Sequence, residues 1–507
     1  MLKHKYITQI LLTVFLLITQ LSNGQYINQR YSFTGASAQT ALNAIENDIG
    51  YIMIGGTSLG YSEIGITQTD FSGNILFQKT YAGTNFSYYA GFQNSLTKLT
   101  NGGYAMYGGV ATSVGAEAVG VLFRFDENGD TLWTKTYGDS LFYQTGRHMR
   151  QTLDGGFILL GHNGTSAASN WIVKTDSLGG VEWEQTYGGP NYEGPAHIAV
   201  CNDGGYIFSG NTASLGPIQA PVPYKVNIRI MKVDSLGNEE FTKVFGELGD
   251  DAPWGIEPTQ DGGYIFGGSL KSDADGHTRF YAVRLDSVGD TIWTKTFNPF
   301  TGITLFGIFN SIQELPDGSF IGGGFEWHTD STTVAYFSGS IIKMDANGNE
   351  LWHKTYRISG MDAHSTDFEI KDMRPTSDGG FICSGFVAPA LPDTGTQDMW
   401  LLKIDSNGCA DTACSLITGI PSTQHSQLNT NSLAVYPNPT NGIITIELPK
   451  NSTSGSFRLI NVRGKEVLDK IINSSTNQID VSHISKGIYF YRYRDKKQGY
   501  AGKLVVQ

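Results

Sequence analysis

Aromatic, acidic and imidazole side chains occur together in several variable stretches of this chain, and they are the residues whose types could bind or transform a ligand. They are Tyr88, Tyr89, Arg147, His148, Asp250, Asp251, Trp254, Asp273, His277, Trp327, His328 and Asp330. An aromatic ring can stack on the apolar face of a sugar while carboxylates and imidazoles bond to its hydroxyl groups. The set favours binding of a carbohydrate or another protein, although each residue alone is also typical of a solvated loop.

The same acids leave an enzymatic alternative open. Asp250 and Asp330 could serve as the two carboxylates of a glycoside hydrolase, which must lie ~5 to 9.5 Å apart. The sequence contains no H-E-x-x-H or G-x-S-x-G motif and no Cys/His metal spacing, so we assign no catalytic residues. A secreted polysaccharide-degrading enzyme, hydrolase or lyase, is the second hypothesis. A passive surface component whose repeats provide rigidity is the third.

Two interleaved turn motifs determine where these residues lie. Asp-x-x-Gly occurs seven times, at Asp70, Asp126, Asp176, Asp234, Asp286, Asp345 and Asp405, and six copies have an aromatic residue seven positions after the Asp. Asp-Gly-Gly-like turns alternate with them at Asp48, Asn101, Asp154, Asp203, Asp261, Asp317 and Asp378. Gly favours tight hairpin turns because it adopts positive φ without steric cost, and short aromatic and β-branched runs follow the turns. Each repeat is therefore predicted to be a four-stranded blade.

Seven such repeats predict an all-β fold, a seven-bladed β-propeller over residues 25–409. The seventh repeat stops at Gly408 without a fourth strand, whereas Gln29–Tyr31 has the pattern of Lys135–Tyr137. Tyr31 precedes Asp48 by 17 residues, which is also the spacing in the third repeat. We therefore expect the N-terminal strand to complete the last blade and to close the ring.

The regular turns and the variable stretches are expected on opposite faces of the ring. In a propeller the A-to-B and C-to-D turns lie on one face, which we call the turn face. The B-to-C loops and D-to-A crossings lie on the other, the loop face. The candidate residues fall in the variable stretches, so the ligand is expected on the loop face, around the central channel.

The N-terminus has the features of a secretory signal peptide, over residues 1–24. Lys3 and Lys5 precede an apolar run from Ile10 to Leu21, which is shorter than the ~20 residues of a membrane-spanning helix. No other stretch is apolar enough to span a membrane. The 507-residue chain has a net charge of −12 without basic clusters, which argues against nucleic acid and anionic membrane surfaces as partners.

The composition changes after Gly408. Residues 410–433 are rich in Ser, Thr, Gln and Asn and are predicted to be a linker, and residues 434–507 form a separate short β pattern. In an exported protein Cys409 and Cys414 could form a small disulfide clip. Cys201 and Cys383 are more typical of small buried apolar residues.

The last part of the chain carries four motifs in order: Val435-Tyr436-Pro437-Asn438-Pro439-Thr440-Asn441-Gly442, Leu459 to Val467, Ile484 to Tyr489, and Lys503 to Gln507. Residues 434–507 resemble the C-terminal sorting domain of type IX secretion cargo in Bacteroidetes, with motif residues Pro437, Asn438, Pro439, Gly442, Gly464, Gly487, Tyr489 and Lys503. The resemblance implies a small Ig-like β-sandwich that is read by the outer-membrane secretion machinery and then removed. The mature protein would be released or attached to surface lipopolysaccharide, and the location extracellular or at the outer-membrane surface.

The propeller repeats have resemblances of their own. Lys343 to Trp352 is similar to the tryptophan-docking repeat of quinoprotein propellers. Those enzymes typically have eight blades and a vicinal Cys pair beneath the quinone, and this chain has no adjacent cysteines, so no quinone is expected. The hairpin also resembles the Asp-box of sialidases, which is structural in that family. Trp, Lys and Tyr at offsets seven, nine and eleven from the Asp share one strand face, and we interpret them as a lock between blades.

Calcium is the one metal that the turns suggest. Asp126-Glu127-Asn128-Gly129-Asp130 and Asp345-Ala346-Asn347-Gly348-Asn349 gather oxygen ligands, but neither is followed by a bidentate carboxylate at EF-hand spacing. An Asp that accepts backbone N–H bonds within its own turn explains the pattern equally. We expect no cofactor, with Ca²⁺ as the alternative.

Overall fold

The structure is a computed structural model, and it describes residues 26–33, 38–58, 62–83, 86–111, 118–138, 144–164, 169–216, 226–247, 249–271, 276–298, 306–329, 335–358, 366–388, 397–411, 433–438, 440–448, 454–461, 465–495 and 499–506. The predicted signal peptide and nearly all of the predicted linker lie outside these ranges. The chain divides into two compact units, Met1–Thr418 and Gly419–Gln507, which are described separately.

In the first unit the turn motifs separate short strands that form seven antiparallel sheets among the described residues. The first three sheets contain β2 (Gln39–Asn47), β3 (Gly50–Ser58), β4 (Ser62–Thr69) and β5 (Ile75–Tyr81); β6 (Ser87–Tyr89), β7 (Thr97–Lys98), β8 (Tyr104–Ala111), β9 (Ala118–Phe125) and β10 (Thr131–Tyr137); β11 (Gly146–Gln151), β12 (Phe157–Asn163), β13 (Ser169–Thr175) and β14 (Val181–Tyr187). The next three contain β15 (Glu193–Val200), β16 (Tyr206–Thr212), β17 (Asn227–Val233) and β18 (Glu239–Phe245); β19 (Ala252–Pro258), β20 (Tyr264–Lys271), β21 (Thr278–Leu285) and β22 (Thr291–Phe297); β23 (Gly307–Glu314), β24 (Phe320–Thr329), β25 (Ala335–Met344) and β26 (Glu350–Tyr356).

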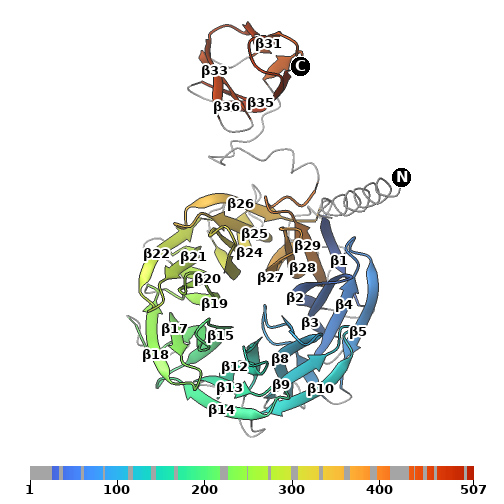
Figure 1. Cartoon of the computed structure of the whole chain (residues 1–507), viewed down its shortest axis with the longest axis vertical. Coiled ribbons are helices and arrows are strands. Elements are labelled where there is room, and N and C mark those ends of the chain that lie inside the picture. The colour runs from blue at the N-terminus through green and yellow to red at the C-terminus, as the bar shows by residue number, and fades with distance from the viewer. Residues whose placement is uncertain are drawn as a thin grey trace, which may run out of the picture. The chain divides into compact units, whose positions relative to one another are not determined.

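The seventh sheet joins the two ends of the unit. It contains β27 (Asp367–Pro375), β28 (Phe381–Ala388), β29 (Asp398–Ile404) and, beside β29, the N-terminal strand β1 (Ile27–Tyr31). The register places Tyr31 opposite Met399 and Ile27 opposite Lys403. The sheets are arranged radially, with strands such as β2, β15 and β19 toward the middle and β10, β14 and β18 at the rim (Figure 1). This arrangement is that of a β-propeller.

Each Asp-x-x-Gly turn is held by its own aspartate. Oδ1 of Asp234 accepts the backbone N–H groups of Leu236 and Asn238, both at 2.8 Å. Gly237 has φ of +84°, which an L side chain rarely adopts. The motif therefore specifies the turn through one acceptor and one glycine.

Residues at offsets seven, nine and eleven from the Asp of these turns contact the next sheet. Trp293 donates from Nε1 to the carbonyl of Ala346 at 3.1 Å, and Lys295 donates to Oδ1 of Asn349 at 3.1 Å. Tyr187 donates to the carbonyl of Gly237 at 2.5 Å. The residues at offsets seven, nine and eleven therefore connect neighbouring sheets, as the sequence interpretation proposed.

Four of the sheets contain a buried cation that pairs with an acid of a turn. Lys232, two residues before the turn residue Asp234, is 1% exposed and lies 2.9 Å from Asp203 and 2.7 Å from Glu240. Lys174, Arg284 and Lys403 pair in the same way with the Asp of the preceding turn. The buried cation thus ties the two turns of one sheet together.

The second unit has two small sheets on a shared core. One contains β30 (Ala434–Tyr436), β31 (Ile443–Glu447) and β34 (Thr476–Asp480); the other contains β32 (Gly455–Asn461), β33 (Glu466–Ile472), β35 (Gly487–Arg494) and β36 (Gly499–Val506). Ile444 and Ile446 from the first sheet and Phe457, Leu459 and Leu504 from the second are fully buried in one cluster. A separate small β unit follows the ring in the sequence.

Candidate functional site

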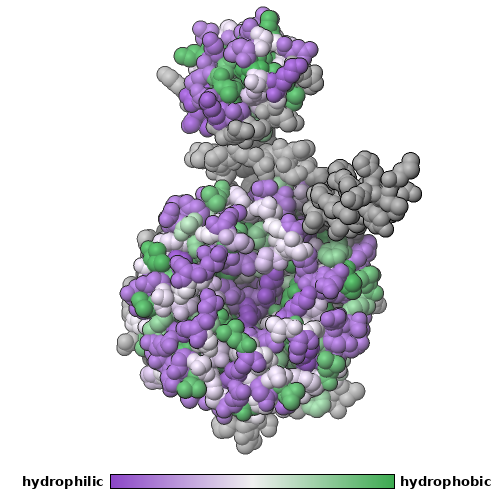
Figure 2. All heavy atoms as spheres, in the orientation of Figure 1, coloured by the Kyte–Doolittle hydropathy of each residue, from purple (hydrophilic) through white to green (hydrophobic). Residues whose placement is uncertain are grey.

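Inner strands of five sheets direct polar side chains toward the middle of the ring. They are His148 in β11, His197 in β15, Glu257 in β19, Ser311 in β23, and Asp372 and Arg374 in β27. The register of each of these strands shifts near this level, as between Gly146 and His148, and such bulges redirect side chains. Hydrophilic residues accordingly occupy the middle of the ring in Figure 2.

The inner strand of the second sheet is interrupted. Its two short pieces, β6 and β7, both pair with β8, and the intervening residues Ala90–Leu96 run into the channel. We call them the plug segment. Asn94 has φ of +63° and is the one non-glycine residue with positive φ in the described ranges; asparagine tolerates this conformation better than most residues.

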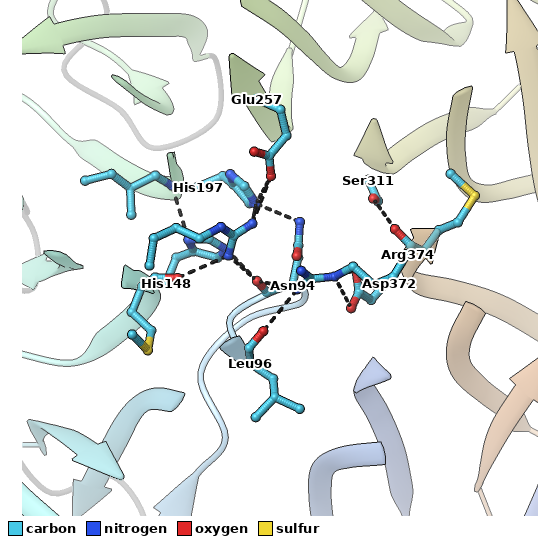
Figure 3. Close-up of polar contacts among 12 residues, drawn as sticks. Asn94, Leu96, His148, His197, Glu257, Ser311, Asp372 and Arg374 are labelled. Atoms are coloured by element: carbon cyan, nitrogen blue, oxygen red, sulfur yellow. Dashed lines mark hydrogen bonds and ion pairs between the residues drawn. The ribbon is translucent and has the colours of Figure 1, made fainter. Parts of the chain in front are cut away.

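The backbone carbonyl of Asn94 is the focus of the cluster. It accepts hydrogen bonds from His148 Nε2 at 2.8 Å, Arg150 Nη1 at 2.6 Å and Arg374 Nη2 at 3.0 Å. Arg374 Nη2 also lies 3.2 Å from the carbonyl of Leu96. The donors come from two strands on different sides of the channel, with the plug segment between them (Figure 3).

The contacts of His148 define its tautomer. Nδ1 lies 3.3 Å from the backbone nitrogen of Ile198, which can only donate. The ring hydrogen is therefore on Nε2 and is donated to Asn94. Arg150 Nη1 lies 3.0 Å from the same Nε2, and because both atoms are donors, they share the carbonyl rather than bonding to each other.

His197 is an acceptor at Nε2. Asn94 Nδ2 lies 2.9 Å away and Arg150 Nη2 lies 3.3 Å away, and both are donors. Arg150 Nη2 also donates to Glu257 Oε1 at 2.9 Å. The imidazole of His197 is therefore neutral, with its hydrogen on Nδ1.

Burial keeps both imidazoles neutral. Their ring centres are 3.7 Å apart, and neither side chain is exposed to more than 1%. Desolvation lowers the pKa of His148 well below 6.5, and His197 and Arg150 lower it further. Desolvation also lowers the pKa of His197 well below 6.5, with Arg150 and Arg374 acting in the same direction.

The charges of the cluster balance. Arg150 pairs with Glu257, and Arg374 pairs with Asp372 through Nε at 3.1 and 3.0 Å from the two carboxylate oxygens. With neutral imidazoles, two cations meet two anions. The cluster thus satisfies its own charges and holds the plug segment.

Aromatic contacts also hold the plug segment in place. Phe92 of the plug segment lies parallel to Trp254, with ring centres 5.6 Å apart at 8°, and the guanidinium of Arg147 lies 4.2 Å from the centre of the Phe92 ring. Arg147, His148 and Trp254 were expected to be exposed to a ligand. They do converge on the channel, but a segment of their own chain covers them, since the interrupted inner strand supplies extra length there.

An open pocket of about 660 Å³ lies where three sheets meet on the loop face. Its lining comes from the starts of inner strands and the ends of their neighbours: Tyr192, Asn211, Val226, Asp250, Asp251, Ala252, Ser269, Lys271, Thr278, Phe306 and Ile308. We call it the Asp250 pocket. It brings together the two predicted acids, Asp250 and Asp251, with residues that the sequence did not single out.

The two acids differ in role. Asp251 is fully buried, and its carboxylate accepts the backbone N–H groups of Lys271 and Glu247, both at 2.8 Å. Burial raises its pKa to about 6. Asp250 is exposed, and partial burial raises the pKa of its carboxyl, while a backbone hydrogen bond from Val226 and the charge of Lys271 oppose the rise. Asp251 therefore shapes the pocket, and Asp250 is exposed in its lining.

The other candidates are not part of one site. Tyr88 lies in β6, where its ring packs 4.9 Å from Tyr81 and 6.0 Å from Phe123, and burial raises its pKa; its neighbour Tyr89 is exposed. Trp327, near the end of β24, packs 5.7 Å from Phe337, and His277 directly precedes β21. Asp273, Asp330 and the side chain of His328 lie outside the described residues.

The aspartates of the acidic turns accept hydrogen bonds from backbone N–H groups of the same turn. Oδ1 of Asp126 accepts the N–H groups of Asn128 and Asp130 at 2.9 and 2.8 Å, and Asp345 does the same in its turn. This supports the turn-stabilising interpretation of these aspartates. Over the described ranges, no group of three or more His, Cys, Asp or Glu residues is placed to hold a metal ion.

The four cysteines differ in state. Cys201 and Cys383 are free and buried, as their sequence context indicates. Cys409 is disulfide-bonded, and Cys414 lies outside the described residues.

Several motif residues of the second unit have structural roles. Asn438 Oδ1 accepts the N–H of Val505 at 2.9 Å, and the carbonyl of Gly442 accepts the N–H of Val481 at 2.7 Å. Tyr489 is buried and donates to the carbonyl of Ser485 at 2.6 Å. Pro437 is exposed after β30, and Gly487 begins β35. Pro439, Gly464 and the side chain of Lys503 lie outside the described residues.

Sequence reasoning missed most of the channel cluster, although a signal was present. A polar residue stands six positions before the turn residue in five repeats, at Ser95, His148, His197, Ser311 and Asp372. Charged residues stand four positions before it at Arg150, Glu257 and Arg374. Residues two apart on a strand share one face, so the offset alone identifies an inward polar stripe. Asn94 and Phe92 had no comparable signal, because they lie in an irregular segment.

Solved structures with a similar fold include the WD40 domain of Pan2 from Neurospora crassa, with a TM-score of 0.41 and 10% identity over 73% of this chain and 88% of that one. The polysaccharide lyase Uly1 has a TM-score of 0.45 and 9% identity over 76% and 93%. These similarities concern the fold alone. No curated protein matches the sequence.

One part of the chain has a family match. Residues 434–507 match the model described as the secretion system C-terminal sorting domain. No described helix is long and apolar enough to cross a membrane. The chain therefore carries the sorting domain of type IX secretion cargo and is a secreted or cell-surface protein.

Proposed function

We propose that the chain is a seven-bladed β-propeller that binds a carbohydrate or a protein ligand outside the cell without transforming it. The observation that carries the proposal is the contrast between the channel and the loop face. The plug segment is hydrogen-bonded to residues on two sides of the channel, whereas the Asp250 pocket is open and lined by both polar and aromatic residues. An open pocket beside an occupied channel supports recognition of a ligand at the pocket.

The enzymatic alternative has less support from the geometry. Acid–base catalysis needs a group whose proton can be exchanged with a substrate. His148 and His197 are committed to Asn94, and Asp251 is committed to two backbone N–H groups. Asp250 alone faces the pocket, and a glycoside hydrolase needs two carboxyl groups.

The export route completes the proposal. A signal peptide over residues 1–24 takes the chain across the inner membrane of a Bacteroidetes cell, and the type IX machinery reads the Ig-like unit at residues 434–507. That unit is then removed, and the ring is released or attached to lipopolysaccharide.

The test is binding of the purified full chain to an array of glycans and polysaccharides, with each hit incubated and assayed for new reducing ends and unsaturated products. Saturable binding without product formation supports a binding protein, and product formation supports the enzyme. A blank array removes carbohydrate from the proposal and leaves a protein ligand. The absence of any ligand among surface proteins as well would leave the passive structural role.

A further inference from the structure

We propose that the Asp250 pocket recognises a neutral pyranose unit of an extracellular polysaccharide, through hydrogen bonds from its polar wall and contact with its apolar wall. This inference rests on the proposed function and names the ligand class and the site. Three observations carry it: a serine hydroxyl in the pocket lining, an exposed acid and an exposed lysine of opposite charge, and apolar side chains in the same lining.

The hydroxyl belongs to Ser269 in β20. This side chain is only 4% exposed and lines the pocket. A hydroxyl can both donate and accept a hydrogen bond, so at the pocket wall it can bond to a hydroxyl group of a ligand. Asn211 also lies in the pocket wall. Its Nδ2 donates to the backbone carbonyl of Asp251 at 2.8 Å, and this bond fixes the position of the amide.

The charges of the pocket favour a neutral ligand. The carboxylate of Asp250 and the ammonium of Lys271 are the charged groups exposed in the pocket lining. The buried carboxylate of Asp251 accepts two backbone N–H groups instead. A carboxylate can accept from two adjacent sugar hydroxyls, and an ammonium can donate to a third. Asp250 would repel the carboxylate of a uronate and Lys271 would repel the ammonium of an amino sugar, whereas a neutral sugar meets no like charge.

Part of the pocket lining is apolar. Val226 and Ile308 are 8% and 6% exposed, and Phe306 is held by Phe325, with ring centres 5.8 Å apart. Apolar and polar groups in one pocket match the two-sided character of a pyranose ring, which has an apolar face and a rim of hydroxyl groups. The volume of about 660 Å³ lies within the ordinary range of ligand sites.

The test uses the full chain and isothermal titration calorimetry with neutral oligosaccharides of glucose, mannose and galactose, with uronate and amino-sugar oligomers as comparisons. Asp250→Asn and Ser269→Ala are the pocket variants. We expect Asp250→Asn to weaken binding of the neutral ligand at least about 10-fold and Ser269→Ala about 3- to 10-fold, the losses expected for a charged and a neutral hydrogen bond. Asp48→Asn is the matched control, since the Asp48 side chain is fully exposed on the turn face, and it should bind as the unaltered chain does.

The outcomes separate the pocket from the proposed function. Neutral-sugar binding that both pocket variants weaken, with unchanged melting temperatures, supports the inference. Glycan binding that neither variant affects overturns the pocket and leaves the proposed function standing. A preference for uronates or amino sugars overturns the neutral ligand class. Failure of every glycan to bind the unaltered chain removes both the inference and the carbohydrate form of the proposed function.

Discussion

The hydroxyl of Tyr31 donates a 2.8 Å hydrogen bond to the carbonyl of Gly73. Tyr137 and Tyr356 make the same 2.8 Å bond to Gly179 and Gly408, each from the rim strand of one sheet to the Asp-x-x-Gly turn of the next. Because Tyr31 is in β1, the N-terminal strand serves as the rim strand that the seventh repeat lacks. The closure of the ring therefore uses the same contact as its other junctions.

Substitution of Tyr31 by Phe should weaken this closure by about 1 kcal/mol, the typical net contribution of one hydrogen bond. All eight tryptophans of the chain lie between Trp133 and Trp400, so tryptophan fluorescence during urea unfolding reports on the ring alone. Tyr137→Phe removes the equivalent bond inside the ring and is the control. We expect similar losses of unfolding free energy but faster hydrogen exchange of residues 27–31 in Tyr31→Phe only. Equal exchange in the two variants would contradict the closing role of β1.

The repeat made much of this fold predictable. Asp-x-x-Gly and Asp-Gly-Gly act locally, so the turns, the strand order and the partner of β1 follow from spacing. The channel cluster depends instead on where β-bulges turn side chains such as His148 and on how seven inner strands meet, which involves residues far apart in sequence. The plug segment was beyond prediction because Asn94 is recognised by donors from other repeats, and nothing in its own neighbourhood marks it.

The turn glycines allow conformational strain and packing to be separated. Gly348 has φ of +74°, and a Cβ there would lie 2.9 Å from atoms of both Trp293 and Lys295. Gly318 has φ of +77° with no atom within 4 Å of the same position. Gly318→Ala should cost about 1 kcal/mol, the strain of a left-handed non-glycine residue. Gly348→Ala should cost at least about 1 kcal/mol more, because overpacking adds to the strain.

The comparison is made by urea unfolding of both variants under one set of conditions. Equal losses of unfolding free energy in the two variants would show that Trp293 and Lys295 can move aside for a methyl group at no cost in stability. That result would contradict the tight packing of Gly348 against the preceding sheet.

The histidine pair should make the stability of the ring depend on pH. The folded-state pKa values of His148 and His197 lie well below 6.5, the ordinary unfolded value. Below pH ~6.5 the unfolded chain therefore binds protons that the native chain does not, and stability falls as the pH falls. Above that pH the contribution is fully present. Asp251, with its pKa raised to about 6, acts in the opposite sense, since it takes up a proton more readily when folded.

His197→Gln isolates the histidine contribution, because a glutamine oxygen can still accept from Asn94 but does not titrate. Melting temperatures between pH 7.5 and 5 should fall less steeply in this variant than in the unaltered chain, with the difference confined to pH values below ~6.5. Hydrogen exchange of residues 90–96 should accelerate over the same interval in the unaltered chain. Parallel pH profiles for the two proteins would contradict a neutral His197 that holds the plug segment.

Lys232 should matter far more than an exposed lysine that makes one ion pair. It is 1% exposed between Asp203 and Glu240; burial lowers its pKa, but the two carboxylates outweigh burial and the net shift is upward. Lys232→Met leaves two half-exposed acids facing each other without a cation, and we expect a loss of about 2 kcal/mol in unfolding free energy from the lost charged hydrogen bonds. Lys243→Met is the control, since Lys243 is 33% exposed and its bond to Asp290 at 2.7 Å lies at the surface; such pairs contribute about 0 to 1 kcal/mol.

Urea unfolding at two salt concentrations checks the assignment. The loss of unfolding free energy in Lys243→Met should shrink at high salt, and the loss in Lys232→Met should persist. Similar small losses in both variants would mean that Asp203 and Glu240 find water or protons when the lysine is removed, and that the buried cation does not tie the two turns of the sheet.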